Sequence, residues 1–373
     1  MKLKRLAKWS AISIVCALGA WLFVSYWRSG NECDRNAAAQ APSMKAIRYC
    51  EYGSPEVVKL DEVEKPVPTD DQILLKVRAA SLNALDAYMV RDNWVNRLIF
   101  GLRKPRDTRL GRDVAGQVEA VGKNITEFKP GDEVFGICRG SLAEYACAAG
   151  RALVIKPPGV TFAQAAAVPL AGLTALQGLR KGNIQAGQKV LINGATGGVG
   201  TFAVQIAKSF GADVTAVCST RNVDLVRSIG ADRVIDYTKE DFTKGGQRYD
   251  MIFDNVANHS FFERRRVLKT NGICVLAGMG GAGVKQGQAL GRISGNLFVA
   301  CGLSSFTSQK FAQYMTKLSK PDLALLGDLM QAGKVKPVIE RTYQLGEASE
   351  ALRNFAAGHA RGKIVITTGL ESP

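Results

Sequence analysis

The second half of the chain alternates between short apolar runs and longer segments with helical periodicity. The apolar runs are short enough to be strands buried on both faces, and they lie at 189–193, 213–218, 233–237, 249–254 and 272–278. Helical stretches follow the first two runs, at 198–210 and up to Ile229. This alternation predicts βαβ units around a parallel, doubly wound sheet of five or six strands in an α/β domain.

The first half of the chain has β-rich runs broken by Gly and Pro. Residues 72–82 (QILLKVRAASL) and 114–122 (VAGQVEAVG) are two such runs, and they predict a small barrel-like β domain. The last apolar run, 362–369 (GKIVITTG), has no similar neighbour, so we expect it to return to this β domain. The predicted units are 44–165, completed by 336–373, and 166–335.

The N-terminal segment carries the longest apolar run. Residues 9–27 contain no charge and are long enough for a helix that crosses a hydrocarbon core of roughly 30 Å. Trp9, Trp21 and Trp27 lie toward its ends, as interfacial anchors do. A cleaved signal peptide is the alternative, although the run is longer than is usual for one. We favour an uncleaved transmembrane helix, with residues 1–43 as anchor and tether.

The chain is strongly basic, with a formal net charge of +16. Its basic residues are scattered singly outside the N-terminal segment, without a recognition motif, which argues against nucleic acid as a partner. Eight cysteines without a CxxC pair and only two histidines argue against a metal site and against a dense disulfide framework. His259 and His359 belong to no catalytic motif and receive no role.

The sequence NGATGGVG at 193–200 follows a predicted strand and opens a predicted helix. Glycines in that context permit a tight turn and a close approach of the backbone to a pyrophosphate, which the helix N-terminus attracts. A lone glycine pattern also fits an ordinary turn, but the βαβ units that follow favour a dinucleotide site in a Rossmann domain. The expected cofactor contacts in the motif are Gly194, Thr196, Gly197, Gly198, Val199 and Gly200.

The end of the second strand of this domain indicates the form of the cofactor. A site that prefers NAD usually carries Asp or Glu there, whereas this chain reads Cys-Ser-Thr-Arg-Asn at 218–222. With no carboxylate to repel it, a 2′-phosphate could accept hydrogen bonds from Ser219 and Thr220 and pair with Arg221. Tyr237 is a further candidate donor. The pattern predicts NADPH, with an exposed surface arginine as the alternative interpretation of Arg221.

The run 187–208 (GQKVLINGATGGVGTFAVQIAK) resembles the quinone oxidoreductase and zeta-crystallin branch of the medium-chain dehydrogenase/reductases. Further matches lie at 111–122, 128–136, 165–176 and 230–237. The resemblance extends from about Met44 to Gly369. It implies a GroES-like, β-rich domain completed by the C-terminal strand, with the Rossmann domain inserted and the substrate reduced in the cleft between the two.

Three positions that hold zinc ligands in metal-using relatives have lost them. Asn83, Arg112 and Ala171 stand there, and neither Ala nor a cationic Arg can bind Zn²⁺, so no metal is expected. Without a metal, the cofactor supplies the hydride, and the protein supplies orientation and donors for developing oxyanion charge. That chemistry suits reduction of a quinone or an activated double bond. Asp113 is expected to form an ion pair with Arg112.

Asn83, Asp86 and Tyr88 form an NxxDxY pattern that resembles one in zinc-free relatives, where these residues lie near the nicotinamide and the substrate. Asn83 and Tyr88 could donate to a carbonyl oxygen, and Asp86 is expected to orient its neighbours. Tyr88 is also a candidate proton donor, with water as an equal candidate. The alternative for Tyr88 is packing in the domain interface.

Further cofactor contacts are expected outside the glycine motif. The resemblance suggests that Thr174 touches the nicotinamide edge. Two turns at strand ends, 254–258 and 276–283, are expected to approach the cofactor, with an ordinary turn as the alternative for both. The residues concerned are Asn255 and Gly278, together with Lys363 on the C-terminal strand. The apolar and basic segment 94–109 could line the substrate entrance or touch a membrane.

These features predict a zinc-independent, NADPH-dependent oxidoreductase that transfers hydride to a quinone or to an α,β-unsaturated carbonyl compound. The alternatives are a zinc-free alcohol dehydrogenase or enoyl reductase acting on another carbonyl substrate, and a non-catalytic, membrane-tethered NADPH sensor. The resemblance is compatible with a homodimer. The excess of Lys and Arg before residue 9 places the body outside the cytoplasm, whereas the cofactor need places it inside, so both locations stay open.

Overall fold

The computed structural model describes residues 42–277, 308–358 and 361–369, together with Gly19, Phe23, Val24 and Cys33. Most of the expected membrane span, 9–27, therefore lies outside the described residues, as do Gly278 and His359. No helix within the described ranges is long and apolar enough to cross a membrane.

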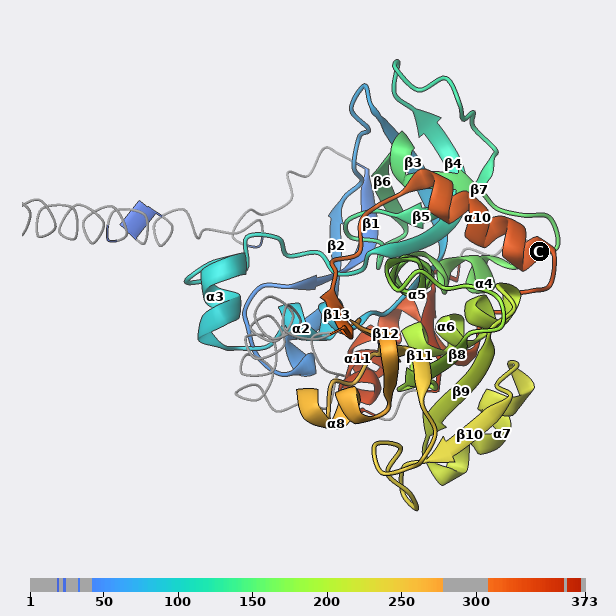
Figure 1. Cartoon of the computed structure of the whole chain (residues 1–373). Coiled ribbons are helices and arrows are strands. Elements are labelled where there is room, and N and C mark those ends of the chain that lie inside the picture. The colour runs from blue at the N-terminus through green and yellow to red at the C-terminus, as the bar shows by residue number, and fades with distance from the viewer. Residues whose placement is uncertain are drawn as a thin grey trace, which may run out of the picture.

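Six parallel strands form the sheet of the second domain (Figure 1). Their order is β10 (Arg233–Asp236), β9 (Asp213–Cys218), β8 (Lys189–Asn193), β11 (Tyr249–Asp254), β12 (Leu268–Leu276) and β13 (Lys310–Gln313). The order reverses beside β8, which is the first strand of the sheet along the chain. The predicted doubly wound α/β domain is confirmed, with β13 as a sixth strand that the apolar pattern did not locate.

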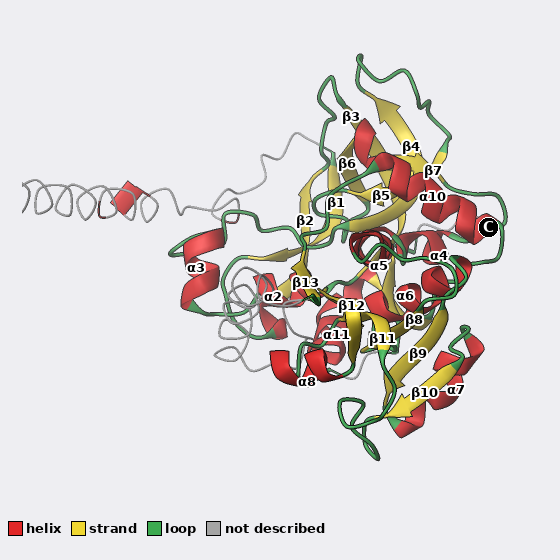
Figure 2. Cartoon of the chain, viewed as in Figure 1, coloured by secondary structure: helices red, strands yellow, loops and turns green. Residues whose placement is uncertain are grey.

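The central strands β8, β9 and β11 are buried on both faces, as their apolar sequences predict, whereas the edge strands β10 and β13 are only partly buried. In β8, Val190 and Ile192 face a core that includes Phe202, whereas Leu191 faces a second core that includes Phe261. Helices lie on both sides of the strands (Figure 2). They are α5 (Pro169–Lys181), α6 (Gly198–Ser209), α7 (Val223–Ser228), α8 (Phe261–Arg266) and α10 (Lys320–Gln331).

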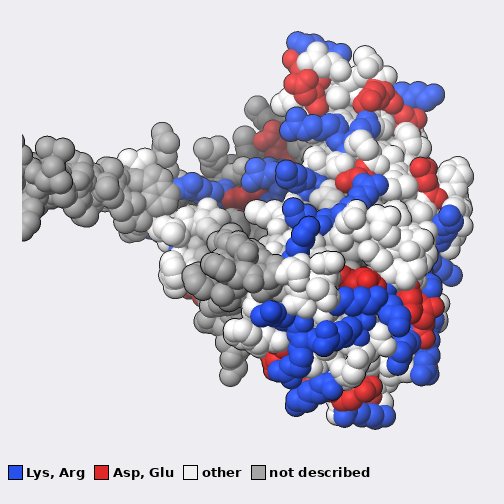
Figure 3. Space-filling view, in the orientation of Figure 1, with Lys and Arg blue, Asp and Glu red and all other residues white. Residues whose placement is uncertain are grey.

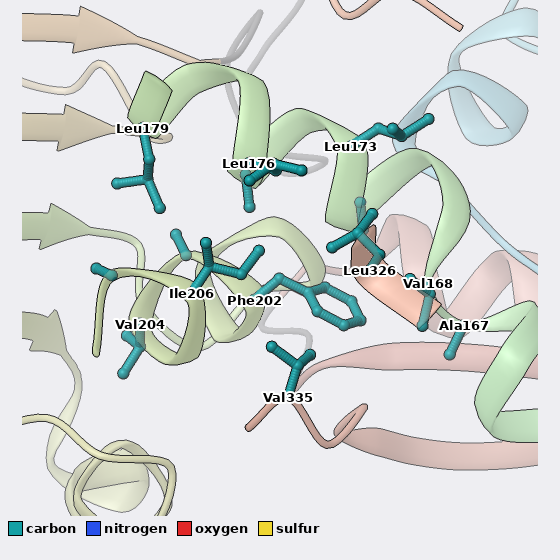
Figure 4. Close-up of a cluster of buried hydrophobic side chains, with 14 of the residues drawn as sticks. Ala167, Val168, Leu173, Leu176, Leu179, Phe202, Val204, Ile206, Leu326 and Val335 are labelled. Carbon is teal, nitrogen blue, oxygen red and sulfur yellow. The ribbon is translucent and has the colours of Figure 1, made fainter. Parts of the chain in front are cut away.

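The larger of the two cores joins α5 and α6 (Figure 4). Leu176 and Leu179 of α5 point toward Phe202 and Ile206 of α6, and Leu326 of α10 adds to the same cluster (Figure 4). Each of these five side chains is fully buried. Complete burial of a Leu, Ile or Phe side chain stabilises a fold by about 1.5 to 3 kcal/mol. This packing fixes α6, and with it the glycine turn at its start.

The first domain is built on a seven-stranded sheet. Its order is β14 (Ile339–Gln344), β15 (Lys363–Thr367), β3 (Gln72–Ser81), β4 (Asp113–Val121), β5 (Glu133–Ile137) and β7 (Leu153–Ile155), with β6 (Tyr145–Ala149) also paired to β3. The C-terminal strand β15 pairs antiparallel with β3, which confirms its expected return to this domain. A separate antiparallel pair consists of β1 (Ser43–Tyr49) and β2 (Val58–Glu64).

Short helices cover this domain and connect its strands. The α-helices are α2 (Ala84–Met89), α3 (Trp94–Phe100), α4 (Phe162–Ala166) and α11 (Ala348–Ala356). The 3₁₀ turns of the described chain are η2 (Pro55–Val57), η3 (Gly150–Ala152), η4 (Thr220–Asn222) and η6 (Leu345–Glu347). Helix α3 projects from the left margin of the described body in Figure 1.

A disulfide joins Cys33 to Cys50, at the end of β1, with a Cα–Cα distance of 5.9 Å. The sequence argued against a dense framework and did not indicate this single bond. Disulfides form and persist in oxidising compartments. The bond therefore fixes Cys33, in the N-terminal segment, to Cys50 in the folded body.

The two domains meet where the glycine turn touches strand β15. Gly197 and Gly362 form an isolated parallel bridge, and the Gly362 N–H donates to the Thr196 carbonyl at 2.8 Å. Gly362 has a φ of +99°, and a Cβ there would lie 2.2 Å from the Val338 carbonyl oxygen, so only glycine fits. The expected cofactor turn is thereby held against the first domain.

Candidate functional site

The glycine turn has the geometry that close approach of a pyrophosphate requires. Gly194 adopts a φ of +82°, which favours glycine, and a Cβ on Gly200 would lie 2.0 Å from the Gly194 carbonyl oxygen. Gly197 differs, because the nearest atom to a Cβ there is 3.9 Å away. Gly194 and Gly200 are thus required by the fold, whereas the space beside Gly197 is open toward the outside of the turn.

Helix α6 starts at Gly198 and runs for twelve residues, so its N-terminal N–H groups and its dipole face that open space. No side chain caps this helix end. Thr196 and Val199 lie within the same turn, as the motif predicts. The turn therefore fits the phosphates of a dinucleotide, and its backbone amides are the groups that would hold them.

A buried polar network lies under the turn. Lys363 Nζ donates to Asn83 Oδ1 at 2.6 Å, to the Leu82 carbonyl at 2.9 Å and to Asp113 Oδ2 at 3.2 Å. The Lys363 and Asp113 side chains are 4% and 0% exposed. The lysine stem crosses beside the glycine turn, since a Cβ on Gly198 would lie 2.9 Å from Lys363 Cδ.

This network corrects one expectation and changes the interpretation of another. Asp113 pairs with Lys363, 250 residues away in the sequence, and not with its neighbour Arg112. Its other contacts are the Ser81 hydroxyl at 2.8 Å, the Asn83 amide at 3.0 Å and the Leu170 N–H at 2.9 Å. All three ammonium protons of Lys363 are directed at these neighbours. Lys363 therefore positions Asn83 and has no proton left for a cofactor phosphate.

Asp86 is the second buried carboxylate of the site and is fully shielded from solvent. Its Oδ2 accepts the Asn83 N–H at 2.8 Å and its Oδ1 accepts the Gly111 N–H at 3.0 Å. Burial is the largest cause that raises the pKa of Asp86, to about 6, while these two hydrogen bonds act in the opposite direction. The geometry agrees with the expected orienting role, because Asp86 fixes the backbone on both sides of the site.

Asp86→Asn is expected to change how stability depends on pH. A raised folded-state pKa means that the folded protein binds more protons than the unfolded chain, so the wild-type protein loses stability as the pH rises toward and through 6. The variant lacks this loss. Its free energy of unfolding relative to wild type should therefore increase by about 2 kcal/mol between pH 4.5 and pH 7, measured by urea denaturation at both values. A constant difference would show that Asp86 titrates normally.

Tyr88 lies on α2, half-buried. Its carbonyl accepts a hydrogen bond from the Asn96 side chain, and no hydrogen bond to its hydroxyl occurs within the described ranges. Asn83 is the N-cap of α2, so one short helix positions both Asn83 and Tyr88. Asn83 is 7% exposed, and one of its two amide protons is used by Asp113.

The adenosine end of the expected cofactor site lies at η4. Ser219 is half-buried and Arg221 is exposed, but the Thr220 hydroxyl donates to Asp236 Oδ2 at 2.5 Å. The expectation that no carboxylate lies nearby was wrong, because Asp236 comes from the end of the next strand, β10. The hydrogen bond from Thr220 is the largest cause that lowers the pKa of Asp236. Tyr237, adjacent to it, is 58% exposed.

Asp236 is compensated locally, which limits its effect on a phosphate. The Thr238 hydroxyl donates to its Oδ1 at 2.7 Å, and Lys239 Nζ lies 3.7 Å from its Oδ2. With Thr220 on the other oxygen, both carboxylate oxygens accept hydrogen bonds from side chains of the surrounding loops. Sequence reasoning missed Asp236 because it searched only the second strand for an acid.

The remaining cofactor contacts expected from the sequence are Thr174, Asn255 and Gly278. The Thr174 hydroxyl donates to the Leu170 carbonyl at 2.7 Å and lies 2.8 Å from the Thr316 hydroxyl. The Asn255 N–H donates to the Asn193 carbonyl at 3.1 Å, which ties the 254–258 turn to the end of β8. Gly278 lies outside the described residues. Thr174 and Asn255 thus stand at the carboxyl edge of the sheet, where ligands of such sheets bind.

Of the three positions without zinc ligands, Asn83 belongs to the polar network. Asn83 bridges Lys363 and Asp113, and Ala171 is buried in α5. Within the described ranges no three His, Cys, Asp or Glu side chains form a group that could hold a metal ion. The charge that organises the site is therefore the ammonium of Lys363.

Comparisons with known proteins agree with this geometry. Residues 69–178 match the model of the alcohol dehydrogenase GroES-like domain, and residues 229–366 match that of a zinc-binding dehydrogenase domain. The chain is 34% identical to the NAD(P)H oxidoreductase RTN4IP1, mitochondrial, of Mus musculus, over 88% of this chain and 90% of that protein. It is 35% identical to the 2-methylene-furan-3-one reductase of Solanum lycopersicum, over 87% and 79%.

A solved structure shows the same fold. The quinone oxidoreductase from Coxiella burnetii superposes with a TM-score of 0.74 at 30% identity, covering 88% of this chain and 100% of that one.

Proposed function

Because the chain belongs to the medium-chain dehydrogenase/reductase superfamily, in its zinc-free branch, we propose that it uses NADPH to reduce quinones or α,β-unsaturated carbonyl compounds. The chain is an oxidoreductase with a nicotinamide cofactor. The observation that carries the proposal is the Lys363–Asp113–Asn83 network, which places the amide of Asn83 beside the glycine turn without a metal ligand set.

The cofactor supplies the hydride when it is bound. The chain holds its phosphates with the backbone amides at the start of α6 and lets them approach at Gly197. Because α5 and α6 are packed in one core, this cradle stays fixed. Because the amides are already in position, little free energy is needed to reorient them during the reaction.

The substrate oxygen is held by donors of the first domain. Asn83 keeps one amide proton beyond those used in the network, and Tyr88 contributes its hydroxyl from the same helix. As negative charge develops on a quinone or enone oxygen, these two donors and the nearby ammonium of Lys363 stabilise it. Lys363 acts through Asn83 and is a positioning residue.

The relatives support this substrate class. One is named as a quinone oxidoreductase, and another as a reductase of a methylene-furanone, which is an α,β-unsaturated ketone. Both substrates place a carbonyl oxygen in conjugation with the carbon that accepts hydride. A single oxyanion site therefore serves either substrate.

The function is tested by oxidation of NADPH by the full chain in detergent micelles, with a short-chain quinone and with an enone, before and after treatment with a chelator. Turnover that the chelator leaves unchanged is the expected result. Binding of NADPH without turnover of either substrate would instead indicate a cofactor sensor. No binding of a nicotinamide nucleotide would overturn the proposal.

Arg221→Ala tests the choice of NADPH over NADH. A charge-assisted hydrogen bond contributes about 1.5 to 3 kcal/mol, so the KM for NADPH should rise roughly 10- to 100-fold while that for NADH stays unchanged. Arg227→Ala, a change of another exposed arginine five residues beyond the end of η4, is the matched control and should alter neither value. An equal rise for both nucleotides in Arg221→Ala would show that Arg221 does not contact a 2′-phosphate.

We also propose that residues 9–27 anchor the protein in a membrane. The uncharged length of this segment supports the anchor. The Lys and Arg residues before it and the Cys33–Cys50 disulfide point to a body outside the cytoplasm, whereas the need for NADPH points to the cytoplasmic side, so the proposal covers the anchor and not the side. The full chain is expected to stay in the membrane pellet after extraction with alkaline carbonate.

A further inference from the structure

We propose that the outer face of α3 rests on the surface of an anionic lipid bilayer. This face consists of Trp94, Leu98 and Ile99 and is bordered by the exposed Arg103 and Arg106. The proposal rests on the membrane anchor proposed above and adds the surface by which the folded body meets the membrane.

The face is apolar and exposed. Trp94, Leu98 and Ile99 are 67%, 40% and 58% exposed, and at 3.6 residues per turn they lie within an arc of about 140° that does not include the buried Asn96. Contiguous exposed apolar side chains on a soluble surface mark interaction sites. A tryptophan with aliphatic neighbours beside basic residues is the composition that binds the interface of a membrane.

The charge around the face fits anionic lipid. The segment from Arg91 to Arg109 contains six Lys and Arg residues and two Asp residues, a net charge of +4. The Lys and Arg side chains are spread over much of the body as well, as Figure 3 shows. The segment is distinctive because it combines this charge with exposed Trp94. Anionic headgroups attract basic side chains that lie within a Debye length of the surface.

The tether brings this side of the body close to the membrane. Five residues lie between Trp27, at the end of the expected span, and Cys33, and this connection reaches roughly 20 Å when fully extended. Cys33 is bonded to Cys50 on the body. The length of residues 28–32 and the disulfide therefore set an upper limit on the distance between Cys50 and the bilayer.

Cys50 lies close to the segment that follows α3, because its neighbours in sequence hydrogen-bond to that segment. On one side of it, the Tyr49 N–H donates to the Thr108 carbonyl at 2.9 Å. On the other, the Tyr52 hydroxyl donates to the carbonyl of Gly101, the C-cap of α3, at 2.9 Å. The disulfide is therefore attached next to the basic segment, and the surface that must stay near the bilayer is the one that carries α3.

Helix α3 is fixed to the body and to the proposed substrate site. The fully buried Asn96 donates to the Arg91 carbonyl at 2.9 Å and to the carbonyl of Tyr88. Arg97 Nε pairs with Asp92 at 2.7 Å. Docking of α3 therefore places Tyr88 one loop away from the lipid surface, a position suited to substrates dissolved in the bilayer.

The test uses the full chain with Trp94 as its only tryptophan. The other three are Trp9, Trp21 and Trp27, which are replaced by Phe to keep the anchor apolar. The protein is reconstituted into vesicles of phosphatidylcholine and phosphatidylserine, with and without brominated acyl chains. We expect Trp94 emission to shift to the blue and to fall at least about two-fold with brominated lipid, and to fall less in vesicles of phosphatidylcholine alone.

The matched control moves the tryptophan to another exposed aromatic position. Phe262→Trp with Trp94→Phe, in the same background, puts it on α8, where Phe262 is 66% exposed and precedes three arginines. Its emission should not respond to brominated lipid. NADPH oxidation with a water-soluble quinone, equal in both proteins, shows that each is folded.

Each other outcome has a defined meaning. Flotation with vesicles but no quenching of Trp94, or equal quenching at both positions, would keep the anchor and overturn the docking surface. A blue-shifted Trp94 that brominated lipid does not quench would show that another protein surface covers the face, and would also overturn the proposal. Failure to float would overturn the anchor and the docking together, while leaving the proposed reductase activity intact.

Discussion

Replacing Lys363 by Met is expected to lower the free energy of unfolding by about 3 to 5 kcal/mol, because it leaves the carboxylate of Asp113 buried without a counter-charge. Asp113 is fully buried, and the remaining donors to it are the Ser81 hydroxyl, the Asn83 amide and the Leu170 N–H. These stabilise the carboxylate but do not neutralise it. Urea denaturation at pH 7 measures the change.

Two further variants make this prediction specific. Lys320→Met breaks a surface ion pair with Glu127, at 2.7 Å, where the side chains are 31% and 65% exposed, and should cost less than about 1 kcal/mol. Asp113→Asn combined with Lys363→Met removes both charges and should recover part of the loss. If Lys363→Met lowers the free energy of unfolding no more than Lys320→Met does, the buried Lys363–Asp113 pair contributes no more to stability than a surface pair.

Lys363→Met should also reduce turnover at temperatures well below its unfolding transition. Lys363 donates to Asn83 Oδ1 and thereby fixes which way the amide protons point. Loss of this contact lets the amide rotate, so kcat should fall more than the affinity for NADPH does. A purely structural role would leave kcat unchanged in the folded fraction.

The parts of the fold that the sequence predicted correctly depend on local pattern. The five apolar runs became strands because each pairs within the sheet and packs apolar side chains against it, although the edge strand β10 is only partly buried. NGATGGVG formed the strand-to-helix turn because its glycines allow the positive φ and the close backbone contacts that this turn requires. Strand β13 was not found, since four residues of mixed polarity at 310–313 carry no periodicity. Its place is set by pairing with β12.

The parts of the site that the sequence did not predict depend on distant contacts. Lys363 and Asp113 are 250 residues apart, and they meet only because β15 pairs with β3. Asp236 reaches Thr220 because β9 and β10 are parallel neighbours, so their carboxyl ends lie at one edge. Local pattern cannot predict either contact. The nearer neighbour Arg112 was the wrong partner for Asp113 for the same reason.

Gly197→Ala is expected to raise the dissociation constant for NADPH roughly 10- to 100-fold without destabilising the fold, if the pyrophosphate approaches the turn at this residue. Gly197 has a φ of −73°, which Ala adopts readily, and the nearest atom to the new Cβ is 3.9 Å away. The methyl group therefore fits the protein and occupies only the space into which the phosphates would move. Fluorescence titration with NADPH and thermal unfolding measure the two effects.

Gly200→Ala is the comparison variant, because its methyl group should disturb the fold as well as cofactor binding. A Cβ there would lie 2.0 Å from the Gly194 carbonyl oxygen and 2.8 Å from the backbone of Ala195, so α6 must move away from β8, and both stability and NADPH affinity should fall. Gly245→Ala, in an exposed turn where the nearest atom is 3.7 Å away, should change neither.

If Gly197→Ala binds NADPH as the wild-type protein does, the phosphates lie elsewhere and the assignment of this turn as the cofactor cradle is wrong. Loss of affinity with unchanged stability in Gly197→Ala alone would locate the pyrophosphate at the one glycine of the motif that the fold itself leaves free.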